Sequence, residues 1–175
     1  RRLAERNAES IFSAVSDEFA RHGIRVLSSV SFMEDSLAPE GWLTRRRPPK
    51  AAEADIEFAV RMARHVSGLD IGQTVVVRRG TVLAVEGFEG TDAAIQRGGE
   101  LGRGRVVVAK VAKPNHDVRF DVPCVGMVTV ESLMKANATA LVVQAGRTFL
   151  LEKARVLDAL ESAGIAVRAV TLEDP

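Results

Sequence analysis

Charged residues of both signs gather at two places beside apolar runs of this chain. At the first, Glu86, Glu89 and Asp92 follow the apolar run Val82–Val85. At the second, five charged residues surround one proline-centred turn: Lys110, Lys113, Asp117, Arg119 and Asp121. Carboxylates suit a hard cation such as Mg²⁺, and lysine and arginine suit phosphate oxygens. The combination predicts phosphate chemistry.

The first group is expected at the edge of a sheet. Glu86 is predicted to end a strand, Glu89 and Gly90 to form a turn, and Asp92 to open a helix. Ligands collect at the carboxyl ends of strands in open α/β sheets, and helix N-termini offer free N–H groups to anions. The backbone amides after Gly90 are therefore candidates to hold a phosphate. The alternative is that Thr91 and Asp92 only cap the helix.

In the second group, charged and apolar residues alternate. Arg119 and Asp121 alternate with Val118 and Phe120, so that the two charges share one strand face with Asp117 at the turn. We interpret this as a binding surface. The alternative is a set of loosely paired surface charges, each pair worth about 1 kcal/mol or less. Asp117 is the residue we expect to matter most, because at the turn it can reach a metal ion or a water without crossing the sheet.

Apolar spacing predicts an α/β fold, with α+β as the alternative, in which a mixed β-sheet is flanked by helices. Helices are expected over residues 3–22, 55–66, 92–101, 129–138 and 152–163. Strands are expected over residues 24–27, 74–77, 81–86, 106–111, 122–125, 140–143, 148–151 and 165–170. Gly80 is predicted to turn a hairpin, Thr91 to cap a helix, and Gly146 to lie in a turn between two strands.

Composition narrows the class of protein. The chain has 175 residues, of which 46% are hydrophobic and 27% charged, which indicates a globular core and excludes wholesale disorder. A net charge of +1 argues against nucleic-acid binding. The sequence has no apolar run that would span a bilayer. Its single cysteine, Cys124, excludes an internal disulfide, fits a reducing cytoplasm and is expected to be buried.

Four segments carry a family resemblance. In chain order they are DIGQTVVV, VLAVEGFEGTDAAI, KVAKPNHDVRFDVPCVG and TVESL. Together they resemble the C-terminal domain of the LpxI-type UDP-2,3-diacylglucosamine pyrophosphatases, enzymes of lipid A biosynthesis in Gram-negative bacteria. The resemblance runs from about Ile24 to the end of the chain, and it is specific because several long segments occur in the right order.

The resemblance implies a hydrolase that uses Mg²⁺ or a similar divalent cation. Its substrate would be UDP-2,3-diacylglucosamine, and its products UMP and 2,3-diacylglucosamine 1-phosphate (lipid X). In the resembled family the acidic residue that matches Asp117 is implicated in catalysis, and the segment EGTDA recurs. This sequence has Asn115 and His116 before that aspartate, where the family usually shows Gly-Gln.

These arguments define the candidate site. The predicted catalytic residues are Asp117, Asp92 and Lys113, and the predicted metal ligands are Asp117, Asp92 and Glu89. The predicted substrate contacts are Glu86, Glu89, Gly90, Thr91, Lys110, Arg119, Asp121 and Gln73. The two acyl chains of this substrate also need an apolar cavity. The many aliphatic residues of the chain could line one, or they could be ordinary core.

The expected organisation is a remnant of an interdomain region over residues 1–50 and the catalytic and lipid-binding domain over residues 51–175. The resembled family carries a further N-terminal domain of about a hundred residues, to which nothing here corresponds. Expected partners are the lipid-linked UDP-sugar, that N-terminal domain, a second copy in a homodimer, and the inner-membrane surface. The alternative is a non-catalytic binding or interaction module. The basic run 45–50 is either solvated or contacts anionic lipid head groups.

Overall fold

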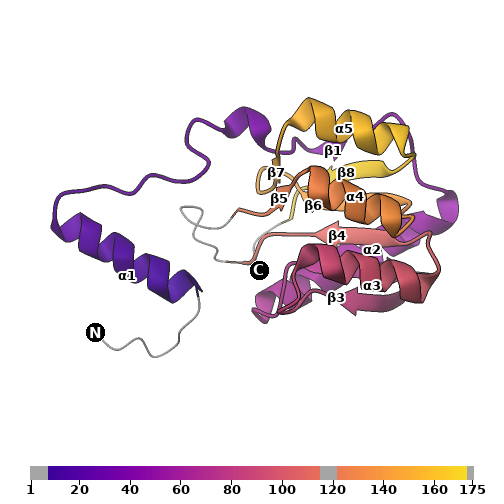
Figure 1. The fold of residues 1–175 in the computed structure, drawn as a ribbon, viewed down its shortest axis with the longest axis horizontal. Coiled ribbons are helices and arrows are strands. Elements are labelled where there is room, and N and C mark those ends of the chain that lie inside the picture. Colours follow the sequence, from indigo (N-terminus) through magenta and orange to yellow (C-terminus); the bar gives the residue numbers. More distant parts are fainter. Residues whose placement is uncertain (1–7, 115–121, 173–175) are drawn as a thin grey trace.

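A six-stranded mixed sheet forms the centre of the computed structural model, which describes residues 8–114 and 122–172 (Figure 1). In spatial order the strands are β1 (Gly41–Trp42), β8 (Ala166–Val170), β6 (Ala140–Gln144), β4 (Val107–Lys110), β2 (Thr74–Arg78) and β3 (Thr81–Val85). Strands β4, β6 and β8 are parallel, whereas β2 is antiparallel to both of its neighbours and β1 is antiparallel to β8. The predicted α/β class with a mixed sheet is confirmed.

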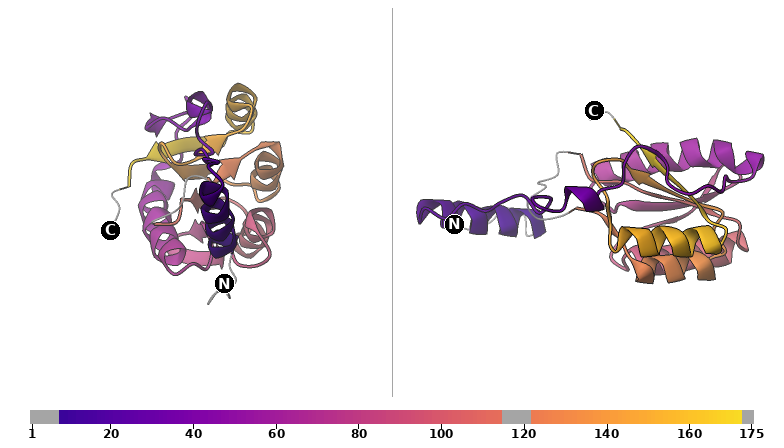
Figure 2. Two further views of the ribbon diagram at one scale, coloured as in Figure 1. Left: turned by 90° about the vertical axis from the view of Figure 1, so that its left-hand side faces the viewer. Right: turned by 90° about the horizontal axis from the view of Figure 1, so that it is seen from above.

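Helices cover both faces of this sheet (Figure 2). One face is covered by α2 (Lys50–Gly68), and the other by α3 (Thr91–Gly102), α4 (Met127–Lys135) and α5 (Lys153–Ser162). The central strand β4 is buried on both sides, with Val107 and Ala109 in the core under α2 and Val108 in the opposite core. Burial on both sides explains why its sequence is apolar up to Lys110 at its carboxyl end.

The predicted strand over residues 24–27 is wrong. These residues form no strand, and Ile24 and Leu27 are 54% and 45% exposed. A strand is stable only when a neighbour pairs with its backbone N–H and C=O groups, and no segment in the described part of the chain does so here. The segment instead connects α1 (Ala8–Arg21), which stands away from the sheet in Figure 1, to a short 3-10 helix at Glu34–Ser36.

Other predicted elements are present with shifted ends or partners. The hairpin of β2 and β3 is confirmed, and Gly80 adopts φ +70° in its turn. Helix α2 starts earlier than predicted, directly after Pro49, because the fixed φ of proline suits a helix start. The strands on either side of Gly146 do not pair with each other: β7 (Phe149–Leu150) pairs in parallel with β5 (Cys124–Val125). Cys124, expected to be buried, is exposed.

The strand register brings several chain segments to one edge of the sheet. Thr74 lies opposite Lys110, Val75 opposite Val85, and Lys110 opposite Val143. The start of β2 and the carboxyl ends of β3, β4 and β6 therefore meet at the same edge. In open α/β sheets this is the edge at which ligands bind.

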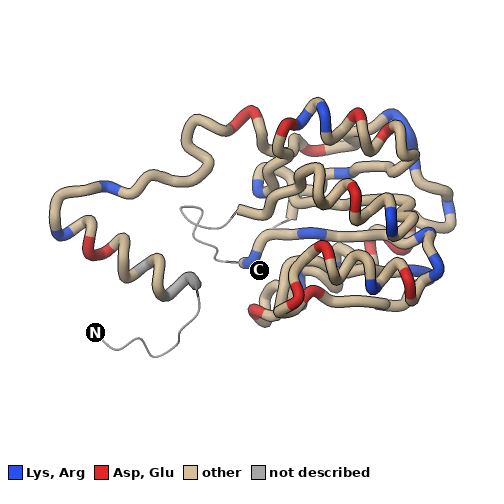
Figure 3. Tube along the Cα trace, in the orientation of Figure 1, with Lys and Arg blue, Asp and Glu red and all other residues tan. Residues whose placement is uncertain are grey.

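Charged residues of both signs are spread along the chain. Figure 3 shows acidic and basic residues interspersed along the helices, in keeping with the net charge of +1. Within residues 8–114 and 122–172, no helix combines the length and apolar content that crossing a membrane requires.

Strand β1 precedes the predicted domain start at residue 51 and nevertheless pairs with β8 in the central sheet.

Candidate functional site

Three of the predicted site residues are joined by hydrogen bonds at the first turn of α3. The Lys110 ammonium donates to Thr91 Oγ1 at 2.6 Å, and the Thr91 hydroxyl donates to Glu86 Oε1 at 2.8 Å. The second carboxylate oxygen, Glu86 Oε2, accepts a hydrogen bond of 3.3 Å from the backbone N–H of Gln73. We call Lys110, Thr91 and Glu86 the lysine network. It connects the end of β4 with α3 and the end of β3.

Lys110 carries its charge in a buried position. It is only 8% exposed, and its nitrogen contacts Thr91, the first residue of α3. That end of a helix bears a partial positive charge, so a buried ammonium beside it is stable only when negative groups are near. Glu86 supplies one such group through Thr91, and a phosphate would supply another. The geometry thus suits an anionic ligand.

Helix α3 begins without a capping side chain. Its N-cap residue is Gly90, which adopts φ +84°, a backbone conformation that favours glycine, and no side chain caps the helix. The prediction that Thr91 is the cap was wrong, because its hydroxyl donates to Glu86. The first amides of α3 therefore receive no acceptor from the N-cap residue, which is the state in which helix N-termini bind phosphate.

Two buried oxygen atoms beside this turn have no hydrogen-bond partner among the described residues. They are Asp92 Oδ1 and Thr74 Oγ1. Thr74 lies opposite Lys110 in the sheet, and the alternation of side chains puts both on the face that α3 covers. A buried polar atom without a partner costs about 1–3 kcal/mol, so two such atoms beside a buried lysine indicate a place where a ligand completes the hydrogen bonding.

Glu89 pairs with Arg97 and not with Lys110. Its carboxylate pairs with Arg97 at 2.5 Å and accepts a hydrogen bond of 3.1 Å from the backbone N–H of Gly87. The hydrogen bond from Arg97 lowers the pKa of the Glu89 carboxylate. Among the described residues Glu89 thus pairs with Arg97, and no hydrogen bond joins it to the lysine network.

Lys113 forms an ion pair with Asp70. Sequence analysis missed Asp70 as a site residue, although it opens the segment DIGQ that carries part of the family resemblance. In the same segment a Cβ atom on Gly72 would lie 2.1 Å from the carbonyl oxygen of Glu86. Only glycine permits this approach, which holds the DIGQ segment against the lysine network.

The predicted metal ligands are Asp117, Asp92 and Glu89. No group of three histidine, cysteine, aspartate or glutamate side chains that could hold a metal ion occurs within residues 8–114 and 122–172. Asp92 alone offers a buried oxygen without a partner, since Glu89 is paired with Arg97. The predicted residues Asp117, Arg119 and Asp121 lie outside the described residues. The described residues by themselves therefore do not form a complete metal site.

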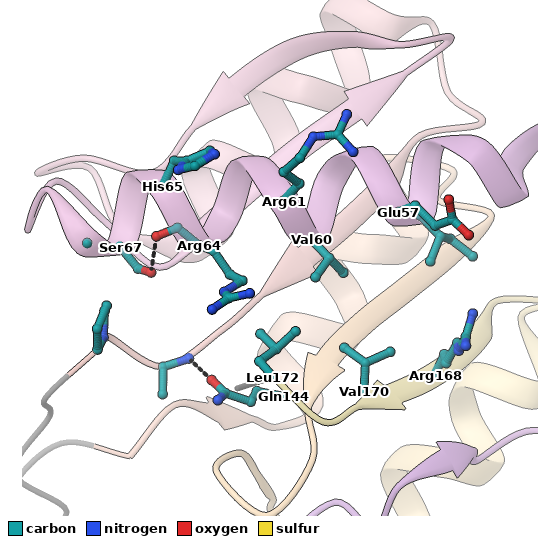
Figure 4. A pocket seen from close by; sticks show the side chains of 14 residues that line it. Glu57, Val60, Arg61, Arg64, His65, Ser67, Gln144, Arg168, Val170 and Leu172 are labelled. Atoms are coloured by element: carbon teal, nitrogen blue, oxygen red, sulfur yellow. Dashed lines mark hydrogen bonds between the residues drawn. The ribbon is translucent and has the colours of Figure 1, made fainter. Parts of the chain in front are cut away.

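A groove on the opposite face of the sheet was not predicted from the sequence. It lies between α2 and the chain that runs from β8 to Leu172, and its volume is about 720 Å³ (Figure 4). Val60, Val170 and Leu172 line its middle, while Ala112 and Pro114 line the end nearest to β4. Its residues come from segments far apart in the sequence, and only the sheet register brings them together.

The sequence is similar to that of a curated protein along most of its length. The chain is 34% identical over 175 residues to the UDP-2,3-diacylglucosamine pyrophosphatase LpxI of Caulobacter vibrioides, an alignment that covers 95% of this chain and 62% of that relative. The chain thus spans about three fifths of the length of the curated relative. Among solved structures, RibD of Acinetobacter baumannii (form 2) matches with a TM-score of 0.40 and 17% identity over 66% of this chain and 36% of that chain. That likeness is too weak to carry an argument.

The model of the LpxI C-terminal domain matches residues 39–168, which include the lysine network, Asp70 and all the strands from β1 to β7. This match extends over well more than half of the chain, and the four segments noted in the sequence fall within it. The protein therefore belongs to the LpxI C-terminal domain family.

Proposed function

We propose that the protein takes part in hydrolysis of the pyrophosphate of UDP-2,3-diacylglucosamine, which yields UMP and 2,3-diacylglucosamine 1-phosphate in lipid A biosynthesis. The family membership and the printed activity of the Caulobacter vibrioides relative support this proposal. The observation in this molecule that carries it is the buried Lys110 ammonium at the uncapped N-terminus of α3.

In this proposal Lys110 and the first amides of α3 bind pyrophosphate oxygens and offset the charge that develops there during bond cleavage. Donors that are held in place before the reaction stabilise such charge without reorganising. Thr91 and Glu86 act as positioning residues, because they fix the Lys110 nitrogen through two hydrogen bonds. Lys113 adds a second ammonium beside Asp70. Asp117 stays the proposed catalytic carboxylate.

We also propose a divalent cation, Mg²⁺ or a similar ion, with Asp92, Asp117 and Glu89 as candidate ligands. When bound, such an ion polarises a phosphoryl oxygen and lowers the pKa of a coordinated water. The unpartnered buried Asp92 Oδ1 supports this proposal. Glu89 would first have to leave Arg97, so Asp92 and Asp117 are the stronger candidates.

The test is release of UMP from UDP-2,3-diacylglucosamine, with the Caulobacter vibrioides relative as the positive control. We expect release that stops with EDTA and returns with added Mg²⁺. The Asp92→Asn variant keeps the side-chain shape and removes the charge, so it should need a higher Mg²⁺ concentration for half-maximal activity. If metal removal left the rate unchanged, the cation proposal would be wrong and the hydrolase proposal would stand.

A second candidate is a binding module that holds the lipid-linked nucleotide without cleaving it. It is favoured by one observation, that the chain matches only 62% of the length of its curated relative. Substrate binding by calorimetry, without UMP release in the same sample, would select this candidate. We then expect release to appear when the chain is joined to the unmatched part of the relative. Absence of both binding and release would reject both candidates.

A further inference from the structure

Gln144 is a polar side chain at the end of an otherwise apolar strand. Strand β6 reads ALVVQ and is buried throughout, with Gln144 only 5% exposed. Its backbone lies opposite Val170 in β8, and the preceding Val143 lies opposite Lys110 in β4. A buried amide side chain is stable only when its polar atoms find partners. Gln144 thus stands on a rigid central strand, at the carboxyl end where ligands collect in open α/β sheets.

The partner of Gln144 is the chain that leaves β4. Its Oε1 atom accepts a hydrogen bond of 3.0 Å from the backbone N–H of Ala112 (Figure 4). The ladder between β4 and β6 ends at Lys110 and Val143, so beyond this point the glutamine side chain takes the place of a backbone acceptor. Ala112 is 7% exposed, and the bond therefore satisfies a buried N–H group. It fixes the residue directly before Lys113.

Two further contacts hold the same stretch of chain. The backbone N–H of Val111 donates to the carbonyl of Gln73 at 3.0 Å, and the Lys113 ammonium pairs with Asp70. The backbone N–H of Gln73 in turn donates to Glu86 of the lysine network at 3.3 Å. Lys113 is therefore placed by its own ion pair and by the backbone bonds just before it, and the same bonds connect it to the lysine network.

The ion pair is the weaker of these constraints on Lys113. The side chains of Lys113 and Asp70 are 28% and 52% exposed, so water and salt screen their attraction. The hydrogen bond from Ala112 to Gln144 is buried, where solvent does not compete for it. A phosphate oxygen can therefore replace the Asp70 carboxylate as the partner of the ammonium while the backbone stays in place.

We propose that Gln144 is a positioning residue for Lys113. By holding the backbone at Ala112, it keeps the Lys113 ammonium where a pyrophosphate oxygen can replace Asp70 as its partner. The inference rests on the proposed function and deepens it, because it names the residue that sets the second ammonium of that site. Misplacing a group at a reacting centre by about 1 Å can cost about 10²-fold in rate, so the loss of one buried hydrogen bond is sufficient to matter.

Binding of inorganic pyrophosphate, measured by calorimetry without metal, tests the inference independently of turnover. Lys113→Met removes the ammonium and should weaken binding about tenfold. Gln144→Met keeps the approximate size of the side chain and removes the acceptor, and it should weaken binding about fivefold. Because both changes act through one ammonium, the double variant should bind as Lys113→Met does, within about twofold. Effects that multiply, full affinity in Gln144→Met, or no binding by the parent would each overturn the proposal.

The amide of Ala112 reports on the hydrogen bond itself. Its hydrogen exchange, followed by NMR, should be slow in the parent and about tenfold faster in Gln144→Met. Gln144→Glu keeps an acceptor oxygen and should restore slow exchange. Equally slow exchange in Gln144→Met would show that Gln144 does not hold Ala112, and the inference would be wrong.

A second glutamine provides the matched control. Gln96 donates a hydrogen bond of 3.4 Å to Ser132 and so joins α3 to α4, away from Ala112 in the chain. Gln96→Met should leave both pyrophosphate binding and exchange at Ala112 unchanged. If it weakened binding as much as Gln144→Met does, the effect would reflect a general loss of stability and the positioning role would be refuted.

The two proposals fail in different ways. If UMP release were absent but the effects of Gln144→Met and Lys113→Met on pyrophosphate binding did not multiply, the positioning role would stand and the hydrolase function would fall. If UMP release were present and the two effects multiplied in both pyrophosphate binding and kcat/KM, the function would stand and Gln144 would not act through Lys113.

Discussion

At the scale of single residues, Lys110 is a buried charge at the end of an otherwise apolar strand. It is 8% exposed, beside the N-terminal end of α3, and its charge is balanced by groups that reach it through Thr91. Replacing a buried charge by an apolar side chain of similar size is often neutral or stabilising. A residue selected only for stability at this position would be aliphatic, like its neighbours in β4.

Lys110→Met should therefore separate stability from function. We expect an unchanged or higher melting temperature, together with a fall of about 10²–10³ in kcat/KM, the usual effect of removing one preorganised donor. Calorimetric melting and UMP release measure the two quantities. Lys135→Met, at the exposed C-terminal end of α4, should change neither. A clear fall in melting temperature with intact kcat/KM would mean that Lys110 is structural.

Glu89 offers a prediction about pH. Arg97 lowers its pKa in the folded state, so the ion pair contributes to stability above the pKa of an unfolded glutamate, and the contribution is lost as the pH falls through the lowered folded value. Carboxyl NMR should find the Glu89 midpoint below the ordinary glutamate range. Arg97→Gln should move that midpoint up, while Arg103→Gln, which removes a charge at the other end of α3, should leave it in place. An unmoved midpoint in Arg97→Gln would disprove the pairing in solution.

At the scale of elements, α3 is held in position by glycines that allow close contact on two sides. A Cβ on Gly98 would lie 2.5 Å from the Val76 side chain, and a Cβ on Gly99 would lie 2.5 Å from the Cα of Ala136. The first contact sets the distance from α3 to the sheet, and the second sets its distance from α4. Because Thr91 and Asp92 open the same helix, these contacts also place the predicted site.

Gly99→Ala should disturb this packing. The clash is with backbone of α4, which cannot rotate away, so we expect a loss of about 1–3 kcal/mol in the free energy of unfolding. Urea denaturation measures it. Gly68→Ala is the matched control, since its Cβ would meet only Pro114 Cγ at an ordinary 3.8 Å and alanine favours a helix. Equal stabilities of the two variants would show that α3 and α4 separate readily.

The elements also show what the sequence could and could not predict. Residues 106–111 are apolar except for Lys110, and this near-continuous apolar run was sufficient to predict a strand buried on both faces. Ile24 to Leu27 have equally good strand residues, but no neighbour pairs with them, and pairing is not a local property. In the site, Glu86, Thr91 and Lys110 were predicted from residue type. The role of Thr74 and the groove between α2 and β8 depend on register, which residue type does not encode.

Over the whole molecule, the helices cover the two faces of the sheet unequally. The lysine network lies on the face covered by three helices, and the groove lies on the face covered by α2 alone. Unequal coverage has a topological cause, because the parallel strands β4, β6 and β8 are followed or joined by helices on the α3 side.

Helix α1, at the N-terminal end of the described chain, leaves its large apolar side chains partly exposed. The stripe of apolar residues on α1 remains 43–47% exposed: Ile11, Phe12, Val15 and Phe19. Further along the chain, Lys153 Nζ donates hydrogen bonds of 3.0 and 2.9 Å to the carbonyls of Asp35 and Leu37. Deletion of residues 1–32 should consequently shift the melting temperature by no more than about 2–4 °C, the equivalent of roughly 1 kcal/mol in a domain of this size.

A longer deletion tests whether β1, rather than α1, stabilises the sheet. Removing residues 1–45 also removes β1 and Thr44, whose hydroxyl oxygen accepts a buried hydrogen bond of 2.9 Å from the backbone N–H of Val167. The outer edge of β8 then loses its partner strand, so the melting temperature should fall well beyond that of the shorter deletion. If instead the 1–32 deletion alone unfolded the protein, the stripe on α1 would have to pack against the body in solution, and the sheet with its two faces would not be an independent folding unit.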